Sequence, residues 1–341
     1  MDFHNKKLVI GLIGAGRIGN VHYKNLRRMS NVQLKTICDI RFDDSWKEKY
    51  PDVSNFTTNY QEVLSDPNIK AVLICVPTDL HPQIIKDAAL AGKDIFCEKP
   101  VGFNNKDIID AFKTVTDQGV KFQVGFNRRF DKSFMRIVDC RNEGKIGRPQ
   151  ILKITSRDPE PPSYDYVAHS GGIFMDMTIH DFDMARFISG NEVKTIFVSG
   201  NILIDDKISK YNDIDTAIIN LKFSNGMLGV IDNSRQAVYG YDQRIELFGS
   251  NGVALAGNVP ESELTYASSN GTTRDNPEYF FLQRYNEAYF NELRSFFGAV
   301  QGKHKVACTF TDGIKAIRLA EAAKKSYNTG TAVEVRDIYS Y

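Results

Sequence analysis

Residues 8–19 have the sequence Leu-Val-Ile-Gly-Leu-Ile-Gly-Ala-Gly-Arg-Ile-Gly, an apolar run that leads into three spaced glycines. A helical pattern follows over residues 19–28. In such a unit Gly14 allows a tight turn out of the strand, and Gly19 lets the helix pack closely against the strand. Gly16 has no Cβ, so a pyrophosphate group can approach the backbone there. Free N–H groups at the start of the helix then bind phosphate favourably. Although a glycine-rich turn alone is weak evidence, the strand before it and the helix after it together predict a dinucleotide site.

An acidic residue in the next strand supports this interpretation. Residues 32–38 alternate as a strand does, and Asp39 follows them, twenty residues after Gly19. A carboxylate there accepts hydrogen bonds from ribose hydroxyls and repels a 2′-phosphate, so NAD is favoured over NADP. Arg41 would weaken that preference. The alternative is an exposed aspartate at a strand end.

Composition limits the class of protein. The 341 residues are enough for two domains, 42% of them are hydrophobic, and the net charge of +1 gives no reason to expect a nucleic acid or an anionic membrane as partner. No apolar run is long enough to span a bilayer, and residues 1–7 lack the apolar segment of a secretory signal. The five cysteines are scattered and form no CxxC, so we expect free thiols in the cytoplasm.

The first third of the chain alternates strands and helices, which is typical of an α/β domain with a doubly wound parallel sheet. Residues 71–76 are continuously apolar, as expected for a central strand. Ligands bind at the carboxyl ends of such strands, so Pro77, Thr78 and His81 are predicted to line the cofactor cleft. A helix N-cap formed by Thr78 or Asp79 is the alternative.

A second strand, residues 94–97, ends in Glu98-Lys99-Pro100. A lysine at this edge can donate a hydrogen bond to a substrate hydroxyl and tune a neighbouring base. Without that location it would be an ordinary solvated lysine.

The pattern changes after a first domain that we place at residues 1–125. The second domain, residues 126–341, has alternating strands with short turns, and so a largely antiparallel open sheet of α+β type. We expect that a C-terminal helix of the second domain can pack back against the first domain. The loop 262–276 is given no role. The strands are expected at 151–155, 195–201, 216–223, 227–232, 244–248 and 332–335, and the later helices at 279–300 and 311–328.

One helical stretch, residues 172–188, lies among these strands. It places Asp176, His180 and Asp183 at i, i+4 and i+7, on one helix face. A histidine with a carboxylate one turn away has the groups of a general base. The alternatives are a solvated face, a structural histidine capped by aspartate, or metal ligands. We expect no metal, because no partner cluster accompanies them.

Three motifs together resemble those of the glucose–fructose oxidoreductase and inositol dehydrogenase family, over residues 8–335. The glycine motif is common, whereas Glu-Lys-Pro combined with Asp-x-x-x-His is specific. Within the family the sequence is most similar to inositol 2-dehydrogenases. The three motifs are residues 14–19, 98–100 and 176–183, and the stretches similar to that subgroup are 126–131, 156–159 and 239–242.

The resemblance implies a Rossmann domain, a C-terminal domain whose open sheet mediates assembly, often into homotetramers, and hydride transfer from an inositol ring carbon to NAD. It implies that His180 takes the hydroxyl proton, Asp176 orients it and Lys99 binds the reacting oxygen. The expected cofactor contacts are Gly14, Gly16, Arg17, Ile18, Gly19, Asp39, Arg41, Pro77, Thr78, His81, Glu98 and Lys99. The expected contacts to the other substrate hydroxyls are Asn127, Arg128, Asp158, Asp183 and either Tyr239 or Tyr241.

Two positions depart from some members of the subgroup. Ser156 replaces a histidine and Asn127 replaces a methionine, so the resemblance leaves myo- and scyllo-inositol open as substrates. A related sugar or polyol dehydrogenase that uses NAD or NADP is the second interpretation. A sensor of nucleotide or sugar without catalysis is the third, and Lys99 and His180, which such a protein can lose, disfavour it.

Overall fold

The computed structural model describes residues 7–335. The start of the N-terminal segment examined for a secretory signal and the outer ends of both expected domains lie outside this range. The chain divides into two compact units. The first is the chain up to Asn127 together with Glu287–Ile314, and the second is Arg128–Asn286 together with the chain from Lys315 onward.

The first unit contains the predicted parallel sheet. All five of its strand pairs are parallel, and the strand order is β3-β2-β1-β4-β5-β6. This order reverses between β1 and β4, which is where doubly wound folds bind their ligands. The strands are β1 (Leu8–Ile13), β2 (Val32–Cys38), β3 (Asn55–Thr57), β4 (Ala71–Ile74), β5 (Asp94–Glu98) and β6 (Phe122–Gly125).

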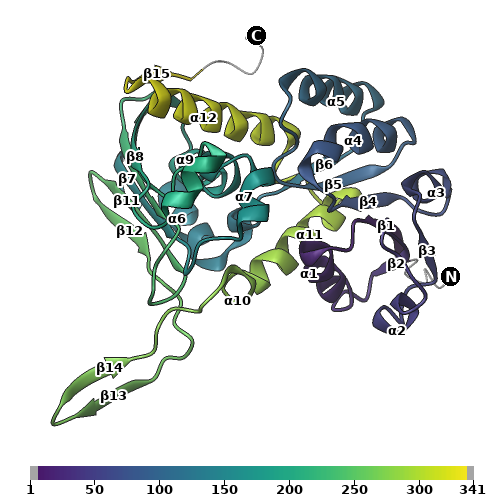
Figure 1. Ribbon diagram of the computed structural model, residues 1–341, viewed down its shortest axis with the longest axis horizontal. Helices are drawn as coiled ribbons and strands as arrows, with labels where there is room; N and C mark the ends of the chain where they lie inside the picture. Colours follow the sequence, from purple (N-terminus) through teal and green to yellow (C-terminus); the bar gives the residue numbers. More distant parts are fainter. Residues whose placement is uncertain (1–6, 336–341) are drawn as a thin grey trace. The chain divides into compact units, whose positions relative to one another are not determined.

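Helices cover this sheet, with α4 and α5 on one side and α1 and α11 on the other (Figure 1). The late helix α11 supplies Leu293, Phe296 and Phe297 to a core that also holds Ile10 and Phe96 from the strands. Chain from beyond residue 286 therefore completes the first unit. Its helices are α1 (Arg17–Leu26), α2 (Trp46–Lys49), α3 (Tyr60–Ser65), the 3₁₀ turn η1 (Thr78–Leu80), α4 (His81–Leu90), α5 (Asn105–Gln118) and α11 (Asn286–Val300).

The second unit is built on a seven-stranded sheet with the order β12-β11-β7-β10-β9-β8-β15. Its strand pairs are antiparallel except β7 with β10, so the predicted, largely antiparallel sheet is confirmed. The strands are β7 (Pro149–Arg157), β8 (Val193–Asn201), β9 (Thr216–Phe223), β10 (Leu228–Ser234), β11 (Asp242–Gly249), β12 (Gly252–Ala256) and β15 (Val333–Glu334).

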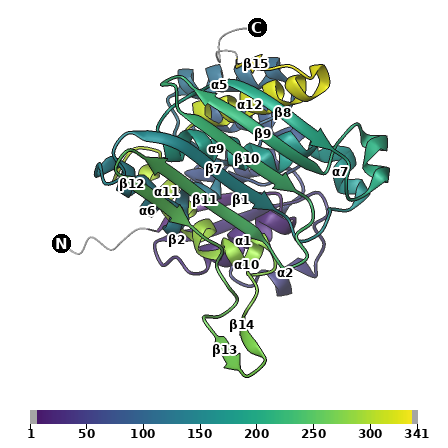
Figure 2. The ribbon, with the colours of Figure 1, turned by 90° about the vertical axis from the view of Figure 1, so that its left-hand side faces the viewer.

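Helices lie on one face of this sheet and leave the other face open (Figure 2). Strand β9 has the matching pattern, because its residues from Ala217 to Phe223 alternate between buried and exposed. The helical elements of the second unit are η2 (Asn127–Phe130, which begins at the unit boundary), α6 (Lys132–Asn142), α7 (Tyr164–Ser170), α8 (Ile173–Asp176), α9 (Thr178–Ser189), η3 (Asp206–Tyr211), α10 (Phe281–Arg284) and most of α12 (Phe310–Thr329).

Two expected helices are each interrupted, and here the sequence prediction was wrong. The stretch 172–188 forms α8 and α9, which are separated at Met177. The stretch 279–300 forms α10 and α11, which are separated at Tyr285. Tyr285 leaves the helical conformation and is buried, with its ring edge-on to Tyr241 at 5.9 Å. Packing of this ring outweighs the local helical preference.

The loop 262–276 forms an arm. Its two short strands, β13 (Thr265–Ser268) and β14 (Gly271–Arg274), pair as a hairpin that projects from the second unit (Figure 1). All eight strand residues are exposed. Because neither face is apolar and buried, the sequence carries no alternation that would have predicted these strands.

Candidate active site

The glycine turn has the geometry of a phosphate cradle. Gly14 has φ +93°, and a Cβ there would lie 2.5 Å from the carbonyl oxygen of Cys75. A Cβ on Gly19 would lie 2.2 Å from the carbonyl oxygen of Gly14. Gly16 is different, because its Cβ would meet only Nη2 of Arg41, at 3.9 Å. Gly14 and Gly19 are thus required by the turn itself, whereas Gly16 leaves open space beside the start of α1, where Arg17 and Ile18 follow.

Asp39 closes the cradle from the end of β2. Its Oδ2 accepts a hydrogen bond from the Ala15 amide at 2.9 Å, and its Oδ1 accepts from the Arg41 amide at 2.9 Å. The Arg41 side chain also donates to both oxygens, at 3.1 and 3.2 Å. Burial alone would raise the pKa of Asp39, but the hydrogen bonds from Arg41 and Ala15 hold the pKa below its usual range. An ionised carboxylate is therefore fixed next to the glycine turn, and these residues fit a dinucleotide.

The end of β4 carries Pro77 and Thr78 as predicted, but His81 has other partners. Its Nδ1 lies 2.7 Å from the carbonyl oxygen of Pro100, and its Nε2 lies 2.9 Å from that of Val76. The ring is buried, which lowers its pKa although both carbonyls oppose this. His81 connects the ends of β4 and β5 and holds the backbone there. Contact with a cofactor stays a prediction for Pro77, Thr78 and His81.

Glu98 and Lys99 follow each other at the end of β5. Glu98 is buried, and its Oε1 lies 2.6 Å from Nε2 of His22 on α1. Lys99 is half-buried and is joined to Pro100 by a cis peptide bond. The two neighbours thus face different surroundings, since Glu98 is held within the unit and Lys99 is partly open to solvent.

In the second unit, Asp176 ends α8 and His180 lies in the first turn of α9. Both are half-buried. Asp176 accepts a hydrogen bond from the Tyr166 hydroxyl at 2.7 Å and lies 3.6 Å from the guanidinium of the buried Arg235. The two elements are not one continuous helix, so the expected i, i+4 spacing does not itself establish contact between Asp176 and His180.

Arg128 is held in a buried polar network. Its guanidinium pairs with Asp181 at 2.6 Å and donates to the hydroxyls of Ser156 at 3.3 Å and Tyr241 at 3.3 Å. The carboxylate of Asp181 also accepts from Asn233 at 2.9 Å. Substrate binding by Arg128 stays a prediction, and in the structure its guanidinium connects α9 with the sheet.

The other predicted hydroxyl contacts have separate partners. Asp183 is buried and accepts from the Arg129 guanidinium at 2.7 Å through both oxygens. The Tyr239 hydroxyl donates to Asp242 at 2.6 Å, whereas Tyr241 faces Arg128. Of the two tyrosines, Tyr241 is the one joined to the Arg128 network. Asn127 is buried at the end of the first unit.

Asp158 follows β7 and shares the electrostatic surroundings of this network. Burial is the main cause that raises its pKa, the charges of Asp176 and Asp181 add to the rise, and those of Arg235 and Arg128 oppose it. Together these effects raise the pKa to about 6. A carboxyl group with such a pKa exchanges its proton close to physiological pH, which is a common property of functional sites.

Sequence reasoning missed several of these partners. Asp181 lies inside the motif of residues 176–183, and its position among apolar neighbours was a signal of burial beside a cation. Tyr166, ten residues before Asp176, and Arg235, in a distant segment, also lie near Asp176 but gave no such signal. Ser156 was noted within a stretch similar to the subgroup and as a departure from some members, but not as part of the network, in which it donates to Gln243 at 3.2 Å.

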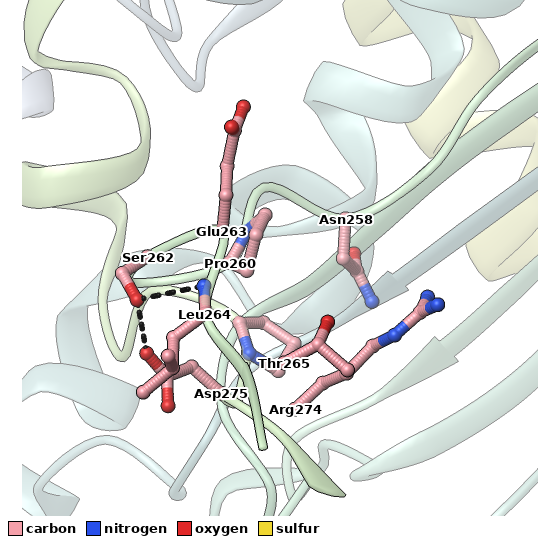
Figure 3. A pocket seen from close by; sticks show the side chains of 9 residues that line it. Asn258, Pro260, Ser262, Glu263, Leu264, Thr265, Arg274 and Asp275 are labelled. Atoms are coloured by element: carbon pink, nitrogen blue, oxygen red, sulfur yellow. Dashed lines mark hydrogen bonds between the residues drawn. The ribbon is translucent and has the colours of Figure 1, made fainter. Parts of the chain in front are cut away.

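A pocket of the second unit lies elsewhere, at the base of the arm (Figure 3). Its lining residues include Asn258, Leu264 and Arg274, and none of the predicted site residues contributes to it. The Ser262 hydroxyl lies between the Asp275 carboxylate and the Leu264 amide and hydrogen-bonds to both. These contacts organise the base of the hairpin.

A parallel sheet with a glycine cradle and a fixed acid at the end of its second strand defines a dinucleotide-binding protein of the oxidoreductase type. Residues 8–126 match the model of the oxidoreductase family with an NAD-binding Rossmann fold, and residues 134–255 match the GFO/IDH/MocA C-terminal domain. The chain belongs to the GFO/IDH/MocA family, as the sequence predicted.

Three relatives cover nearly the whole chain. A myo-inositol 2-dehydrogenase of Thermotoga maritima is 44% identical over 96% of this chain and 99% of its own. An inositol 2-dehydrogenase of Rhizobium meliloti is 41% identical over 93% of this chain and 96% of its own. The crystal structure of scyllo-inositol dehydrogenase from Lactobacillus casei, with bound NAD(H) and scyllo-inositol, is 27% identical, covers 97% and 99% of the two chains, and has a TM-score of 0.89.

Proposed function

We propose that the protein is an NAD-dependent inositol 2-dehydrogenase that oxidises a ring hydroxyl of myo- or scyllo-inositol to the ketone. The observation that carries this proposal is the fixed Asp39 carboxylate beside the open Gly16 backbone, in a chain whose full-length relatives are named inositol dehydrogenases. The reaction takes a hydride from the ring carbon and a proton from its hydroxyl. When bound, NAD supplies the hydride acceptor.

The chain's own residues supply the proton chemistry and the orientation. We assign His180 as the base that takes the hydroxyl proton, Asp176 as the group that orients it, and Lys99 as the donor to the reacting oxygen. Asp176 suits this role because Tyr166 and Arg235 fix its carboxylate. We also assign contacts to the remaining hydroxyls, made by Asn127, Arg128, Asp158, Asp183 and Tyr241 rather than Tyr239. A site built from such groups rejects analogues that leave them unpaired.

A related dehydrogenase that uses NADP is the second candidate, and one observation favours it. The Arg41 side chain neutralises Asp39 and is 68% exposed beside Gly16. By turning outward, Arg41 would offer a cation to a 2′-phosphate. We assign NAD as the preferred cofactor, because Asp39 keeps the amide hydrogen bonds of Ala15 and Arg41 whichever way that side chain points.

We further propose that the first unit binds the cofactor, and that the second binds the substrate and mediates assembly into a homotetramer. A row of exposed apolar side chains crosses four registered strands of its open sheet face: Val253, Phe248, Ile151 and Leu228. Apolar patches of this kind mark protein interfaces. A role in inositol catabolism and a cytoplasmic location belong to the same proposal; all five cysteines are free thiols. Within residues 7–335, no helix has both the length and the apolarity to cross a bilayer.

The assigned roles are tested by Lys99→Met and His180→Asn. We expect each to lower kcat by about 10²- to 10⁴-fold on inositol while NAD still binds, because each removes a group that acts on the reacting hydroxyl. Lys106→Met and His304→Asn change exposed residues of the same types and serve as controls. Turnover within twofold of the wild type in either test variant would show that its role is assigned wrongly.

A further inference from the structure

Three titratable side chains meet inside the first unit, away from the glycine cradle. They are His22 on α1, Glu98 at the end of β5 and Glu292 on α11, and each offers one ligand-type atom within 4.8 Å of the others. His22 and Glu292 are fully buried, and Glu98 is 8% exposed. The proposed reaction assigns no part to His22 or Glu292, so the burial of this His–Glu–Glu cluster needs another reason.

The first two members form a close pair. Nε2 of His22 lies 2.6 Å from Oε1 of Glu98, within hydrogen-bond distance. The ring of His22 is packed edge-on against Phe96 at 5.2 Å and Tyr289 at 5.9 Å, so it has little freedom to turn away. On the other side, a Cβ on Gly125 would lie 3.1 Å from the Glu98 carboxyl group, which shows how closely β6 confines it.

The third member is a carboxyl group without a hydrogen bond. Among the described residues, neither oxygen of Glu292 has a partner, and the residue is fully buried. Burial raises its pKa well above the usual range, and the charge of Glu98 raises it further. An ionised carboxylate in that position would be strongly unfavourable, so the surroundings of Glu292 favour the neutral acid. Burial raises the pKa of the Cys75 and Cys97 thiols, and the charge of Glu98 raises both further.

The geometry favours protons over a metal ion in this cluster. Two ligands bound to one tetrahedral zinc at 2.0–2.1 Å lie about 3.3 Å apart. The 2.6 Å separation of Nε2 and Oε1 is the length of a hydrogen bond instead. A metal would have to break that bond and remove the proton from Glu292.

We propose that His22, Glu98 and Glu292 form a buried proton-holding cluster that fixes the end of β5, and that His22 is thereby a positioning residue for Lys99. A neutral Glu292 adds no second negative charge beside Glu98, so the Glu98 carboxylate stays directed at His22. Because Glu98 and Lys99 are consecutive, the backbone at Lys99 is held by the same contacts. The existence of the cluster is inferred from the contacts among its three residues, whereas its effect on turnover rests on the proposed function of Lys99.

The first test measures the proton directly. Difference infrared spectroscopy of the full-length wild type against Glu292→Gln should show a protonated carboxyl C=O band that shifts in D₂O and is missing from the variant. Metal analysis of the same samples should find no stoichiometric ion. Absence of the band from the wild type, or a stoichiometric metal that Glu292→Gln loses, would overturn the proposal, and the second result would make the cluster a metal site.

The second test measures positioning. Glu292→Gln replaces a neutral acid by a neutral amide and should keep kcat within about twofold. His22→Ala leaves the Glu98 carboxylate buried without its donor and should lower kcat about tenfold or more with little change in the KM for NAD. His22→Gln, which restores a donor, should recover part of the loss and remains informative if His22→Ala does not fold.

The outcomes of these tests separate the two proposals. If His22→Ala folds and retains wild-type kcat while Lys99→Met is inactive, positioning by the cluster is wrong and the role of Lys99 stands. If Lys99→Met is fully active, the proposed function of Lys99 is wrong, and with it the effect of the cluster on turnover. The infrared band does not depend on either result, so the state of Glu292 is decided separately.

Discussion

At the scale of single residues, the site is governed by the environment given to each carboxyl group. Asp39 and Asp158 are the same residue type with opposite behaviour. Hydrogen bonds from Ala15 and Arg41 lower the pKa of Asp39, whereas burial near other carboxylates raises that of Asp158 to about 6. The first group is therefore a fixed anion for ribose hydroxyls, and the second exchanges its proton near neutral pH.

The raised pKa of Asp158 predicts how stability depends on pH. A carboxyl group whose pKa is higher in the folded state than its ordinary value of 3.8 binds more protons when folded, so the free energy of unfolding falls as pH rises from about 3.8 to about 6. Asp158→Asn removes this penalty. The variant should match the wild type below pH about 4 and exceed it at pH 7, by at most about 3 kcal/mol.

Urea denaturation of both proteins across this pH range measures the difference. Asp165→Asn, which changes an exposed aspartate of α7, is the control and should show no such trend. A stability difference that is constant over the range, or that grows toward acid pH, would contradict the assignment of the raised pKa.

At the scale of elements, the strand–turn–helix unit of β1 and α1 depends on two glycines for folding and on one for access. Gly14 and Gly19 face backbone atoms at 2.5 and 2.2 Å, so a side chain at either would displace the turn. Gly16 has an ordinary φ of −68° and open space on its side-chain side. Two glycines of this motif are thus needed to form the turn, whereas the third leaves space for the cofactor.

This difference predicts opposite results for two alanine variants. Gly19→Ala should lower the free energy of unfolding by at least about 2 kcal/mol, because its Cβ meets a backbone oxygen that cannot move freely. Gly16→Ala should change stability by less than about 1 kcal/mol yet raise the KM for NAD about tenfold, since the methyl group fills the space for pyrophosphate. Thermal unfolding and initial rates measure both. Equal stability of the two variants would contradict this account.

How much of this was predictable from the sequence also differs between elements. The β1–α1 unit and the central strand β4 were predicted because their signals are local. The breaks at Met177 and Tyr285 were not, because the apolar pattern continues through both and the cause at Tyr285 is a ring contact with Tyr241, 44 positions away in the sequence. The pair of Arg128 on η2 with Asp181 on α9, 53 residues apart, likewise joins segments that only the fold brings together.

At the scale of the whole molecule, the second unit presents a sheet with one face uncovered. Its exposed row lies in register: Val253 opposite Phe248, Phe248 opposite Ile151, and Ile151 opposite Leu228. An exposed apolar row of this kind is unfavourable in water and is suited to burial against a second copy. The sequence predicted strands at β7, β10 and β11 but not at β12, and the alignment of four side chains into one row follows from the register of these four strands.

The proposed assembly predicts that a charge in this row separates the subunits. Leu228→Glu should convert a tetramer into smaller species in light scattering while the far-UV circular dichroism is kept, because a buried unpaired carboxylate opposes association. Leu90→Glu, at an exposed position at the end of α4 in the first unit, is the matched control and should keep the wild-type mass. A monomeric wild type, or a Leu228→Glu variant with the wild-type mass, would contradict assembly through this face.

The central claim is the reaction, and its direct test is the initial rate of NADH or NADPH formation with myo-inositol, scyllo-inositol, chiro-inositol, glucose and xylose, each with NAD and with NADP. We expect turnover on one or two of the inositols with NAD, and much slower turnover with NADP because Asp39 opposes a 2′-phosphate. The isomer that reacts would also decide between myo- and scyllo-inositol. Turnover only on an aldose, only with NADP, or on none of the five would contradict the assignment.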